Sequence, residues 1–519
     1  MSYIKAAYEF TDDVSDDSPA FDGAFVLLLA FALAVRVFQS VNTQVIELDS
    51  YTIIEIARTF GNLSSLTLMD FAVNVHPLFP FLMALVSKCG IGYEAAGKAL
   101  SILFGTLTIF PVYLMAKDTY GRKVGRYSAF LFAIHPYLFV NASNVLRDSM
   151  SIFFIVMTFF IAWKGFQEKK DRYLVLSGCM AALAYLTKAE GLFCIVAVFL
   201  FIWMRDPHRE ETTVRDRLRS TISFASVALT AAVCLIIVFS LKAHSFSLSV
   251  DKPLSLLSLF SQPPGGLESE LTALEGISTG LTFSDMALAF FLEFLEAIFA
   301  IYVFLLGVNL VRLWTKDRLL PLERYYLFII VTLLLLDFVY FSMSHLFSRR
   351  YFLSLVVLLM GFMAYGLRLL QARVENLLKR RNGSVFVLKT LMVILVAGMV
   401  AGGLIKGSYY WEFRKASLKS TGYYILSHSG AGRTILTDDP RIAYYANGSY
   451  RMLTEDALRE ATSGPTGACP YDFIVFYSNE SLMLYEKYAR PIADSGFIDR
   501  AVLFPPRSNK LVIVECSKR

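Results

Sequence analysis

Residues 99–121 read ALSILFGTLTIFPVYLMAKDTYG, an apolar run that gives way to polar residues at Lys117. A helix needs about 20 apolar residues to cross the hydrocarbon core of a bilayer, because no water there can satisfy its backbone polar groups. Similar runs recur along the chain. We predict eleven spanning segments, of which the third is broken by Pro136 and the sixth is short: 22–40, 91–116, 127–141, 149–166, 173–187, 190–204, 220–242, 285–313, 325–344, 351–370 and 384–406.

The composition leads to the same fold class. Of the 519 residues 56% are hydrophobic, and the mean hydropathy is +0.53. A soluble globule has no interior large enough to hide so much apolar surface. The sequence therefore predicts an α-helical polytopic membrane protein with about 11–13 transmembrane helices, allowing for an uncertain count at broken segments.

Basic residues predict the orientation of these segments. They gather in every second turn, at 117–126, 164–172, 205–219, 312–324 and 368–381. Short turns rich in Lys and Arg stay in the cytoplasm. We therefore expect a multi-pass protein of the plasma (inner) membrane, with its N-terminus in the cytoplasm and everything after residue 406 outside. Topology accounts for the net charge of +6, and no basic and aromatic patch predicts a nucleic-acid partner.

These boundaries divide the chain into a cytoplasmic tail (1–20), a membrane domain (21–406) and an extracytoplasmic domain (407–519). The membrane domain contains an outer loop at 41–90, in which His76 to Val86 fits a short interfacial helix. A second outer loop, at 243–284, is rich in Ser, Pro and Gly and is expected to be mobile.

The extracytoplasmic domain is predicted to be a small α/β module. Stretches rich in β-branched, aliphatic and aromatic residues at 434–437, 471–477 and 511–515 indicate strands, and the pattern at 454–461 indicates a helix. Cys469 and Cys516 lie in this domain. An oxidising outer space would permit a disulfide between them, but two cysteines do not demonstrate one.

Residue types suited to catalysis gather in the turns that face outside. A carboxylate close to a hydroxyl can act as a general base. Lys and Arg beside it can hold a phosphate and stabilise the charge that remains when the phosphate departs. Such a set suits transfer from a lipid-linked phosphate donor to a hydroxyl, although loop charges are commonly only solvated. The residues come from four turns: Glu47, Asp49, Tyr51, Arg58 and His76; Arg147 and Asp148; Lys188 and Glu190; His345, Arg349, Arg350 and Tyr351.

Further charges fall inside the predicted segments, all in their outer halves: Arg36, Glu293, Glu296 and Asp337. Charges at membrane depth are costly, so they usually line a polar cavity or pair with one another. Two interpretations remain open. The charges line a polar cavity, or Arg36 simply neutralises one of the acids. Either interpretation implies a hydrated cavity that opens to the outside.

Short motifs occur along these turns in a fixed order. Asp49 and Tyr51, followed by Ala57-Arg58, resemble a DE-x-Y…AR signature; residues 76–80 (HPLFP) resemble HPPLYP; residues 187–191 (TKAEG) resemble T-R/K-P-E-G; and Arg350-Tyr351 resembles an RY pair that opens a late helix. Together they resemble the GT-C glycosyltransferases, in the branch of the protein O-mannosyltransferases and lipid A aminoarabinose transferases. The resemblance covers about residues 20–370.

The resemblance implies roles for the residues. The donor would be a sugar on a polyprenyl phosphate, and Asp49 would be the general base that takes the proton of the acceptor hydroxyl, with inversion at the anomeric carbon. Lys188 and Arg350, with Arg349 in reserve, would bind the donor phosphate, and Asp148 would orient a substrate. The other residues would line the substrate cavity: Glu47, Tyr51, Arg58, His76, Arg147, Glu190, His345, Tyr351, Glu293 and Asp337.

Each role has a structural alternative. Asp49 could cap the helix that begins near Ser50, Lys188 and Arg350 could be interfacial anchors, and His76 could be a structural hydrogen-bonding residue. We expect no cofactor. A divalent metal on Asp49, Asp148 and a histidine is the alternative for relatives with diphosphate donors, but no ligand spacing supports it. Ser50 stands where the family often has Glu.

The sequence thus predicts an enzyme that moves one sugar from a polyprenyl-phosphate carrier to a hydroxyl acceptor (a glycan, glycolipid or protein) at the outer face of the bilayer. An oligosaccharyltransferase that uses a lipid-diphosphate glycan is the first alternative, but a second acidic metal motif and a WWDYG-like stretch are not found in the sequence. The second alternative, a lipid or polysaccharide flippase, would need inverted repeats and helices broken near the midplane.

Overall fold

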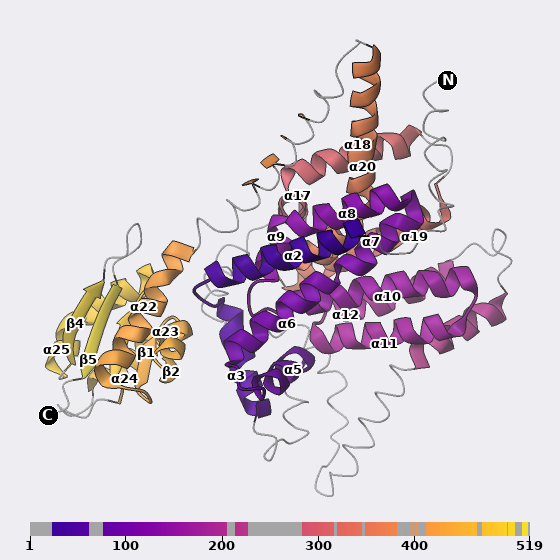
Figure 1. Ribbon diagram of the computed structural model, residues 1–519. Helices are drawn as coiled ribbons and strands as arrows, with labels where there is room; N and C mark the ends of the chain where they lie inside the picture. The colour runs from indigo at the N-terminus through magenta and orange to yellow at the C-terminus, as the bar shows by residue number, and fades with distance from the viewer. Residues whose placement is uncertain are drawn as a thin grey trace, which may run out of the picture.

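The structure is a computed structural model. It describes residues 23–61, 76–204, 213–226, 283–315, 319–344, 348–380, 412–463, 470–495, 497–503 and 511–516, with a few positions between 390 and 402. Within these residues a helical domain precedes a smaller α/β domain (Figure 1).

The helical domain follows the predicted apolar runs. Its elements are α2 (Gly23–Asn42), α3 (Leu48–Gly61), α5 (Leu78–Ser87), α6 (Tyr93–Leu107), α7 (Ile109–Tyr120), α8 (Arg122–Ile134), α9 (Pro136–Asn141), α10 (Asp148–Glu168), α11 (Asp171–Thr187), α12 (Gly191–Met204), α17 (Phe283–Ile298), α18 (Ala300–Thr315), α19 (Pro321–Ser344), the 3₁₀ helix η2 (Arg349–Phe352) and α20 (Leu353–Arg380). The predicted segment at 384–406 and most of that at 220–242 lie outside the described residues.

Several of these helices are long and apolar enough to cross a bilayer. Among the described residues five qualify, and a bent pair formed by α17 and α18 would make a sixth. Helices α11 and α12 are shorter but coincide with the predicted segments at 173–187 and 190–204. The prediction of an α-helical polytopic membrane protein is therefore confirmed.

Two interruptions in the bundle follow directly from the sequence. Helix α8 ends at Ile134, His135 is extended, and Pro136 opens α9, because proline has no N–H to continue the helix. Helices α7 and α8 are separated only by Gly121, whose φ of +89° lets the chain reverse at once between them.

A third interruption differs from the prediction. The segment at 285–313 is not one straight helix, since α17 and α18 meet at an angle of 98°. Phe299 lies between them with a φ of +72°, which is unusual for a residue with a side chain. The carbonyl oxygen of Ile298, freed by the break, lies 3.1 Å from Nε2 of the buried His135. No proline or glycine in the sequence marks this break, so tertiary packing decides it.

The C-terminal domain contains a five-stranded sheet in the order β2-β1-β3-β5-β4. Its strands are β1 (Thr434–Thr437), β2 (Ser449–Met452), β3 (Phe473–Phe476), β4 (Phe497–Leu503) and β5 (Leu511–Cys516). Strand β1 pairs in parallel with β2 and β3, whereas β5 runs antiparallel to β3 and β4. The helices are α22 (Glu412–Ser429), α23 (Pro440–Tyr445), α24 (Glu455–Ser463) and α25 (Asn479–Asp494). The predicted small α/β module is confirmed, and Cys516 is bonded in a disulfide.

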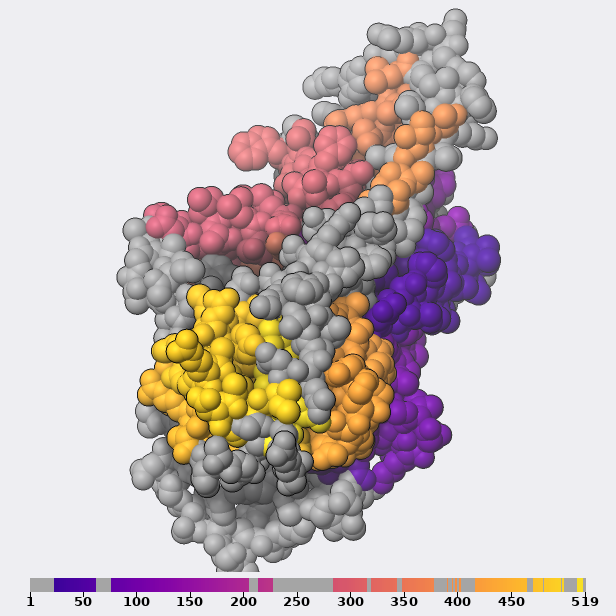
Figure 2. All heavy atoms as spheres, turned by 90° about the vertical axis from the view of Figure 1, so that its left-hand side faces the viewer, coloured from indigo at the N-terminus to yellow at the C-terminus, as the bar shows by residue number. Residues whose placement is uncertain are grey.

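Among the described residues, the two domains touch where α22, α23 and β2 meet α3 and the segment before it. The rings of Tyr51 and Tyr450 meet edge to face, and the guanidinium of Arg58 lies over the ring of Tyr444 at 5.5 Å. Figure 2 looks onto the C-terminal domain, with the first helices beside it. This contact matters because α3 carries Asp49.

Candidate functional site

Four separate parts of the chain bring acids and bases into one cluster. Asp49 lies in the first turn of α3, Asp148 opens α10, Lys188 follows the last residue of α11, and Arg350 lies in η2. Arg350 donates a hydrogen bond of 2.5 Å to Asp49, and Lys188 donates one of 2.8 Å to Asp148. The charges of Asp148 and Arg350 also act on each other, so the two pairs form one electrostatic unit.

The two pairs differ in their exposure to solvent. The side chains of Asp49 and Arg350 are 44% and 35% exposed, whereas those of Asp148 and Lys188 are 6% and 13% exposed. Lys188 has a second carboxylate partner in Glu190, whose oxygen lies 2.7 Å from Nζ. The ammonium also lies over the ring of Tyr351, 4.6 Å from its centroid. Water therefore reaches Asp49 far more easily than Asp148.

Burial and neighbouring charges together decide the protonation state of Lys188. Burial alone would lower the pKa of Lys188, but the charges of Asp148 and Glu190 outweigh it and hold that pKa above its usual value. Lys188 is therefore a permanent cation shared by two acids.

His76 borders this group as a neutral imidazole. Its Nδ1 lies 2.7 Å from the carbonyl oxygen of Tyr185, and its ring packs edge to face on the Tyr185 ring. Burial lowers the pKa of His76 to about 4, and the charges of Arg147 and Lys188 act in the same direction. His76 thus fits the structural alternative better than a role as a proton carrier at neutral pH.

Ser50 ties the Asp49 helix to the loop that precedes Asp148. Its buried hydroxyl donates a hydrogen bond of 2.9 Å to the carbonyl of Val145, three residues before Asp148. The sequence showed Ser50 only as a departure from the acid common at this position. Its positioning role was missed, because nothing local to Ser50 indicates a partner 95 residues away.

Arg147 is the cation of this region that has no carboxylate within bonding distance among the described residues. Its charge acts on Asp148, His76 and Glu190, which places it beside the cluster. The guanidinium makes no hydrogen bond or ion pair with a described side chain, in contrast to Lys188 and Arg350. Among the described residues no side chain therefore competes with an anionic ligand for the donors of Arg147.

Arg349 belongs to a second group that faces α17. Its guanidinium lies 3.2 Å from Glu293 and 2.9 Å from Glu296, and it donates a hydrogen bond of 3.2 Å to the hydroxyl of Tyr137. The proposed pairing of Arg36 with one of these acids is wrong. Arg36 is fully buried, lies over the Phe132 ring at 5.1 Å and donates to the carbonyl of Ala32.

The remaining candidates lie at the edges. Arg58 is exposed, pairs with Glu55 and lies over Tyr444, so it does not reach the cluster. Asp337 is buried in α19, close enough for its charge to interact with Glu190 and Lys188. Glu47 is half-buried and interacts with Arg441 of the C-terminal domain. His345 lies outside the described residues.

The cap interpretation of Asp49 is wrong, because α3 begins at Leu48 and Asp49 lies inside its first turn. Its carboxylate binds Arg350 rather than the backbone at the helix start. Within the described residues no group of three or more His, Cys, Asp or Glu side chains could hold a metal ion.

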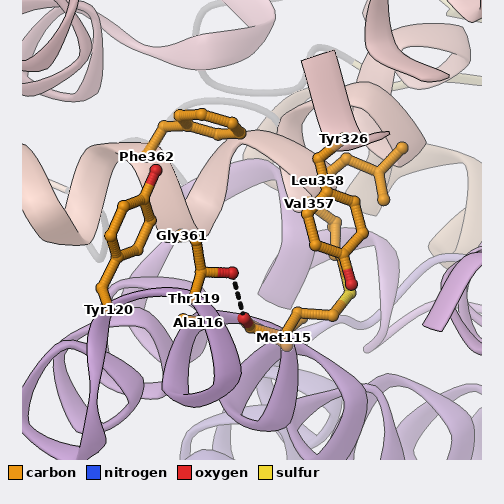
Figure 3. A pocket seen from close by; sticks show the side chains of 10 residues that line it. Met115, Ala116, Thr119, Tyr120, Tyr326, Val357, Leu358, Gly361 and Phe362 are labelled. Atoms are coloured by element: carbon orange, nitrogen blue, oxygen red, sulfur yellow. Dashed lines mark hydrogen bonds between the residues drawn. The ribbon is translucent and has the colours of Figure 1, made fainter. Parts of the chain in front are cut away.

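A small pocket lies elsewhere, between α7, α19 and α20 (Figure 3). Its walls are mostly apolar, and the hydroxyl of Thr119 is already bonded to the carbonyl of Met115 at 2.7 Å. Lys164, near the end of α10, pairs with Asp118 of α7, whereas Asp148 opens α10. The pocket is therefore at the opposite end of α10 from the cluster.

The chain is similar in sequence and in fold to known proteins. Residues 74–241 match the family model described as dolichyl-phosphate-mannose-protein mannosyltransferase. ArnT from Cupriavidus metallidurans, solved with undecaprenyl phosphate, superposes with a TM-score of 0.55 at 14% identity, over 94% of this chain and 97% of that one. The oligosaccharyltransferase of Archaeoglobus fulgidus, solved with zinc and sulfate, gives 0.54 at 13% identity, over 94% and 72%.

The chain has the GT-C fold. The superposition on ArnT extends over nearly the whole of both chains, which includes the C-terminal domain as well as the helices. A putative mannosyltransferase of Bacillus subtilis, YkcB, is 23% identical over 133 residues, which are 26% of this chain and 18% of that protein. The fold and the family model agree with the resemblance seen in the motifs.

Proposed function

We propose that the protein is a glycosyltransferase that moves one sugar from a polyprenyl-phosphate carrier to a hydroxyl acceptor at the outer face of the membrane. The observation that carries the proposal is the ion pair between Asp49 and Arg350, exposed to solvent and set against a buried acid–base group. A carboxylate that water reaches can meet an acceptor hydroxyl, and the adjacent guanidinium suits a phosphate. The phosphate also agrees with the similar proteins, which include an ArnT solved with undecaprenyl phosphate and a family described by dolichyl-phosphate-mannose.

Asp49 would act as the general base. It takes the proton from the acceptor hydroxyl as the oxygen attacks the anomeric carbon, and the bond from that carbon to the phosphate oxygen breaks on the opposite face. The sugar is then inverted, and the polyprenyl phosphate leaves with both bonding electrons. The charge that develops on the departing phosphate needs cations that are already in place.

Arg350 would link donor binding to the release of the base. Its guanidinium is bonded to Asp49. A donor phosphate competes for the same N–H groups, since Arg binds phosphate as well as carboxylate. Formation of the phosphate contact would free Asp49 for the acceptor, so the donor would bind first.

Arg147 would supply a further phosphate contact. The earlier assignment of Lys188 to the phosphate stays a prediction, but Lys188 already serves Asp148 and Glu190. Arg147 has no such competitor among the described side chains, and its charge acts on the same cluster. Lys188 is then better suited to holding Asp148 in place than to binding the donor.

The orientation belongs to the same proposal. The basic turns favour a cytoplasmic N-terminus and an extracytoplasmic C-terminal domain, and the cluster would then face the outer side. The plasma membrane is the expected location, and the acceptor is a glycan, a glycolipid or a protein.

A second candidate is an oligosaccharyltransferase with a lipid-diphosphate donor. It is supported by the superposition on the Archaeoglobus enzyme at a TM-score of 0.54. The superposition on ArnT, which was solved with undecaprenyl phosphate, has a similar TM-score of 0.55 but extends over 97% of the ArnT chain, against 72% of the Archaeoglobus enzyme. The monophosphate donor is therefore the better-supported proposal.

The test uses the purified full-length protein in lipid nanodiscs. It is incubated with sugars on polyprenyl monophosphate and on diphosphate, and release of the free lipid phosphate is measured with wild type, Asp49→Asn and Glu55→Gln. Glu55 is the matched control, since it lies on the same helix and pairs only with Arg58 among described residues.

The proposal predicts release from a monophosphate donor by wild type and Glu55→Gln, and loss of release with Asp49→Asn. Release only from the diphosphate donor would favour the second candidate. Movement of intact donor between leaflets without release would indicate a flippase and overturn both.

A further inference from the structure

The segment of residues 43–47 joins α2 to α3 and leads directly to Asp49. Side chains from elsewhere hold its backbone. Lys98 of α6 donates a hydrogen bond of 3.0 Å to the carbonyl of Thr43, and it also pairs with Glu94. A connecting segment without regular structure takes one conformation only if its polar groups find such partners.

Tyr445 makes the central contact with this segment, from α23 of the C-terminal domain. Its hydroxyl accepts a hydrogen bond of 2.9 Å from the backbone N–H of Ile46. The same hydroxyl donates to the carbonyl of Gln44 at 3.4 Å. Tyr445 is buried, and burial raises its pKa, so the hydroxyl keeps its proton and both bonds over the working range of pH.

Two cations of the same domain reinforce this contact. Lys419 donates to the carbonyl of Gln44 at 2.7 Å, and its ammonium lies 5.1 Å from the centroid of the Tyr445 ring. Arg441 donates to the carbonyl of Ile46 at 3.4 Å. Arg441 is itself fixed by Asp439, whose side chain caps the start of α23.

We propose that the C-terminal domain is a positioning part of the catalytic site, and that the Tyr445 hydroxyl sets the place of Asp49 by clamping residues 44–46. The inference rests on the proposed role of Asp49 as general base. Asp49 lies three residues beyond Ile46, so a shift of the segment moves the carboxylate directly. A displacement of about 1 Å can cost about 100-fold in rate.

The contacts favour a clamp over simple adhesion between domains. Adhesion needs only the apolar ring, which phenylalanine would supply equally well. The hydroxyl instead satisfies one backbone donor and one backbone acceptor within three consecutive residues. On its other side Asp49 is fixed by the hydroxyl of Ser50 on Val145. The backbone is therefore held both before Asp49, by Tyr445, and after it, by Ser50.

Tyr445→Phe is the decisive variant, with Tyr424→Phe as its matched control. Tyr424 lies in α22 of the same domain, is partly buried, and packs its ring on His428, and its hydroxyl has no hydrogen bond to the described residues. Each variant removes one oxygen from a tyrosine of this domain. Only Tyr445→Phe removes the contact with residues 44–46.

The first measurement is hydrogen exchange of the backbone, followed by mass spectrometry, and it needs no activity. We expect peptides that cover residues 43–51 to exchange about tenfold faster in Tyr445→Phe than in wild type, because the N–H of Ile46 loses its acceptor. Peptides of β1, β3 and β5 should keep their protection, as should all peptides of Tyr424→Phe. Unchanged exchange at 43–51 would overturn the clamp.

The second measurement is turnover of the polyprenyl-phosphate sugar. We expect kcat of Tyr445→Phe to fall about tenfold with the KM for donor unchanged, because the base is displaced while the phosphate contacts remain. Equal kcat in Tyr445→Phe and wild type would overturn the positioning role and leave the proposed function standing. If wild type releases no lipid phosphate, the proposed function fails, and hydrogen exchange still decides whether the clamp exists.

Discussion

The two ion pairs of the site share the same chemistry but not the same surroundings. Asp49 and Arg350 meet where water reaches both side chains, whereas Asp148 and Lys188 meet in the interior, together with Glu190. An exposed pair contributes about 0–1 kcal/mol to stability and can exchange partners readily. A buried pair that loses one partner leaves an uncompensated charge, which costs about 3–5 kcal/mol.

This difference in burial suggests that the two ion pairs have different roles. The exposed pair can open when a phosphate arrives, so it suits catalysis. Separating the buried group costs much more free energy, so this group suits a structural role. It holds the start of α10 against the end of α11. The following changes would break or sharpen this comparison.

The largest effect is expected from Asp49→Asn. Asparagine keeps the shape of the side chain but cannot take a proton, and the contribution of a general base is about 100- to 10,000-fold in rate. We expect kcat to fall within that range. The stability should change by no more than about 1 kcal/mol, because the ion pair that is lost is exposed. Turnover and thermal unfolding are measured on the same preparation. Turnover at the wild-type rate would remove Asp49 from the mechanism.

The opposite outcome is expected from Lys188→Met. It leaves Asp148 and Glu190 without their cation, so the free energy of unfolding should drop by about 3–5 kcal/mol. Lys164→Met is the control, because the Lys164–Asp118 pair is about a quarter exposed and should cost about 1 kcal/mol at most. Denaturant unfolding in detergent compares the two. Similar losses in both variants would mean that burial does not separate the pairs.

Acid should lower the stability of the protein through His76, which borders the buried Asp148–Lys188 group. Its pKa is about 4 in the folded protein and 6.5 in the unfolded chain, so the unfolded chain binds the proton more readily between these values. Stability from the neutral ring is complete above pH 6.5 and is lost as the pH falls toward about 4, by about 2 kcal/mol at pH 5. His76→Gln should lack this part of the pH dependence in thermal unfolding. A slope equal to that of wild type would contradict the buried neutral imidazole.

The smallest effect is expected from Ser50→Ala. The variant removes one buried hydrogen bond to Val145, which is worth about 1 kcal/mol. We expect a loss of stability of that size together with a lower kcat, because Asp49 is the next residue. Ser87→Ala also removes a hydroxyl bonded to a backbone carbonyl, but at the end of α5, and should leave kcat unchanged. Equal kcat in both variants would separate Ser50 from the site.

Sequence patterns located the elements that are regular and apolar. The runs that became α2, α10 and α19 are recognisable by length and hydropathy alone. In the C-terminal domain, β1, β3 and β5 were predicted because they are rich in β-branched, aliphatic and aromatic residues, and the structure buries most of these side chains. Strands β2 and β4 were missed, since they lie at the two edges of the sheet and carry polar residues such as Arg451 and Asp499.

The structure brings four of the predicted site residues together, but the sequence did not predict how they pair. Asp49, Asp148, Lys188 and Arg350 were selected because their motifs follow one another on turns of one predicted side. No motif indicated that Arg350 pairs with Asp49, 301 residues away, rather than with Asp148. It also suggested Arg36 as the partner of a deep acid, a role that Arg349 takes instead.

By itself, the sequence determined that this chain is a bundle of apolar helices, and it predicted that the candidate catalytic residues lie on one side of the membrane, because hydropathy and charge are properties of local composition. Only the tertiary structure decided which acid meets which base, how much water reaches each pair, and that Tyr445 of a distant domain holds the backbone beside Asp49. The physical reason is that ion pairing, burial and hydrogen bonding depend on distances between segments, and these distances are set by packing.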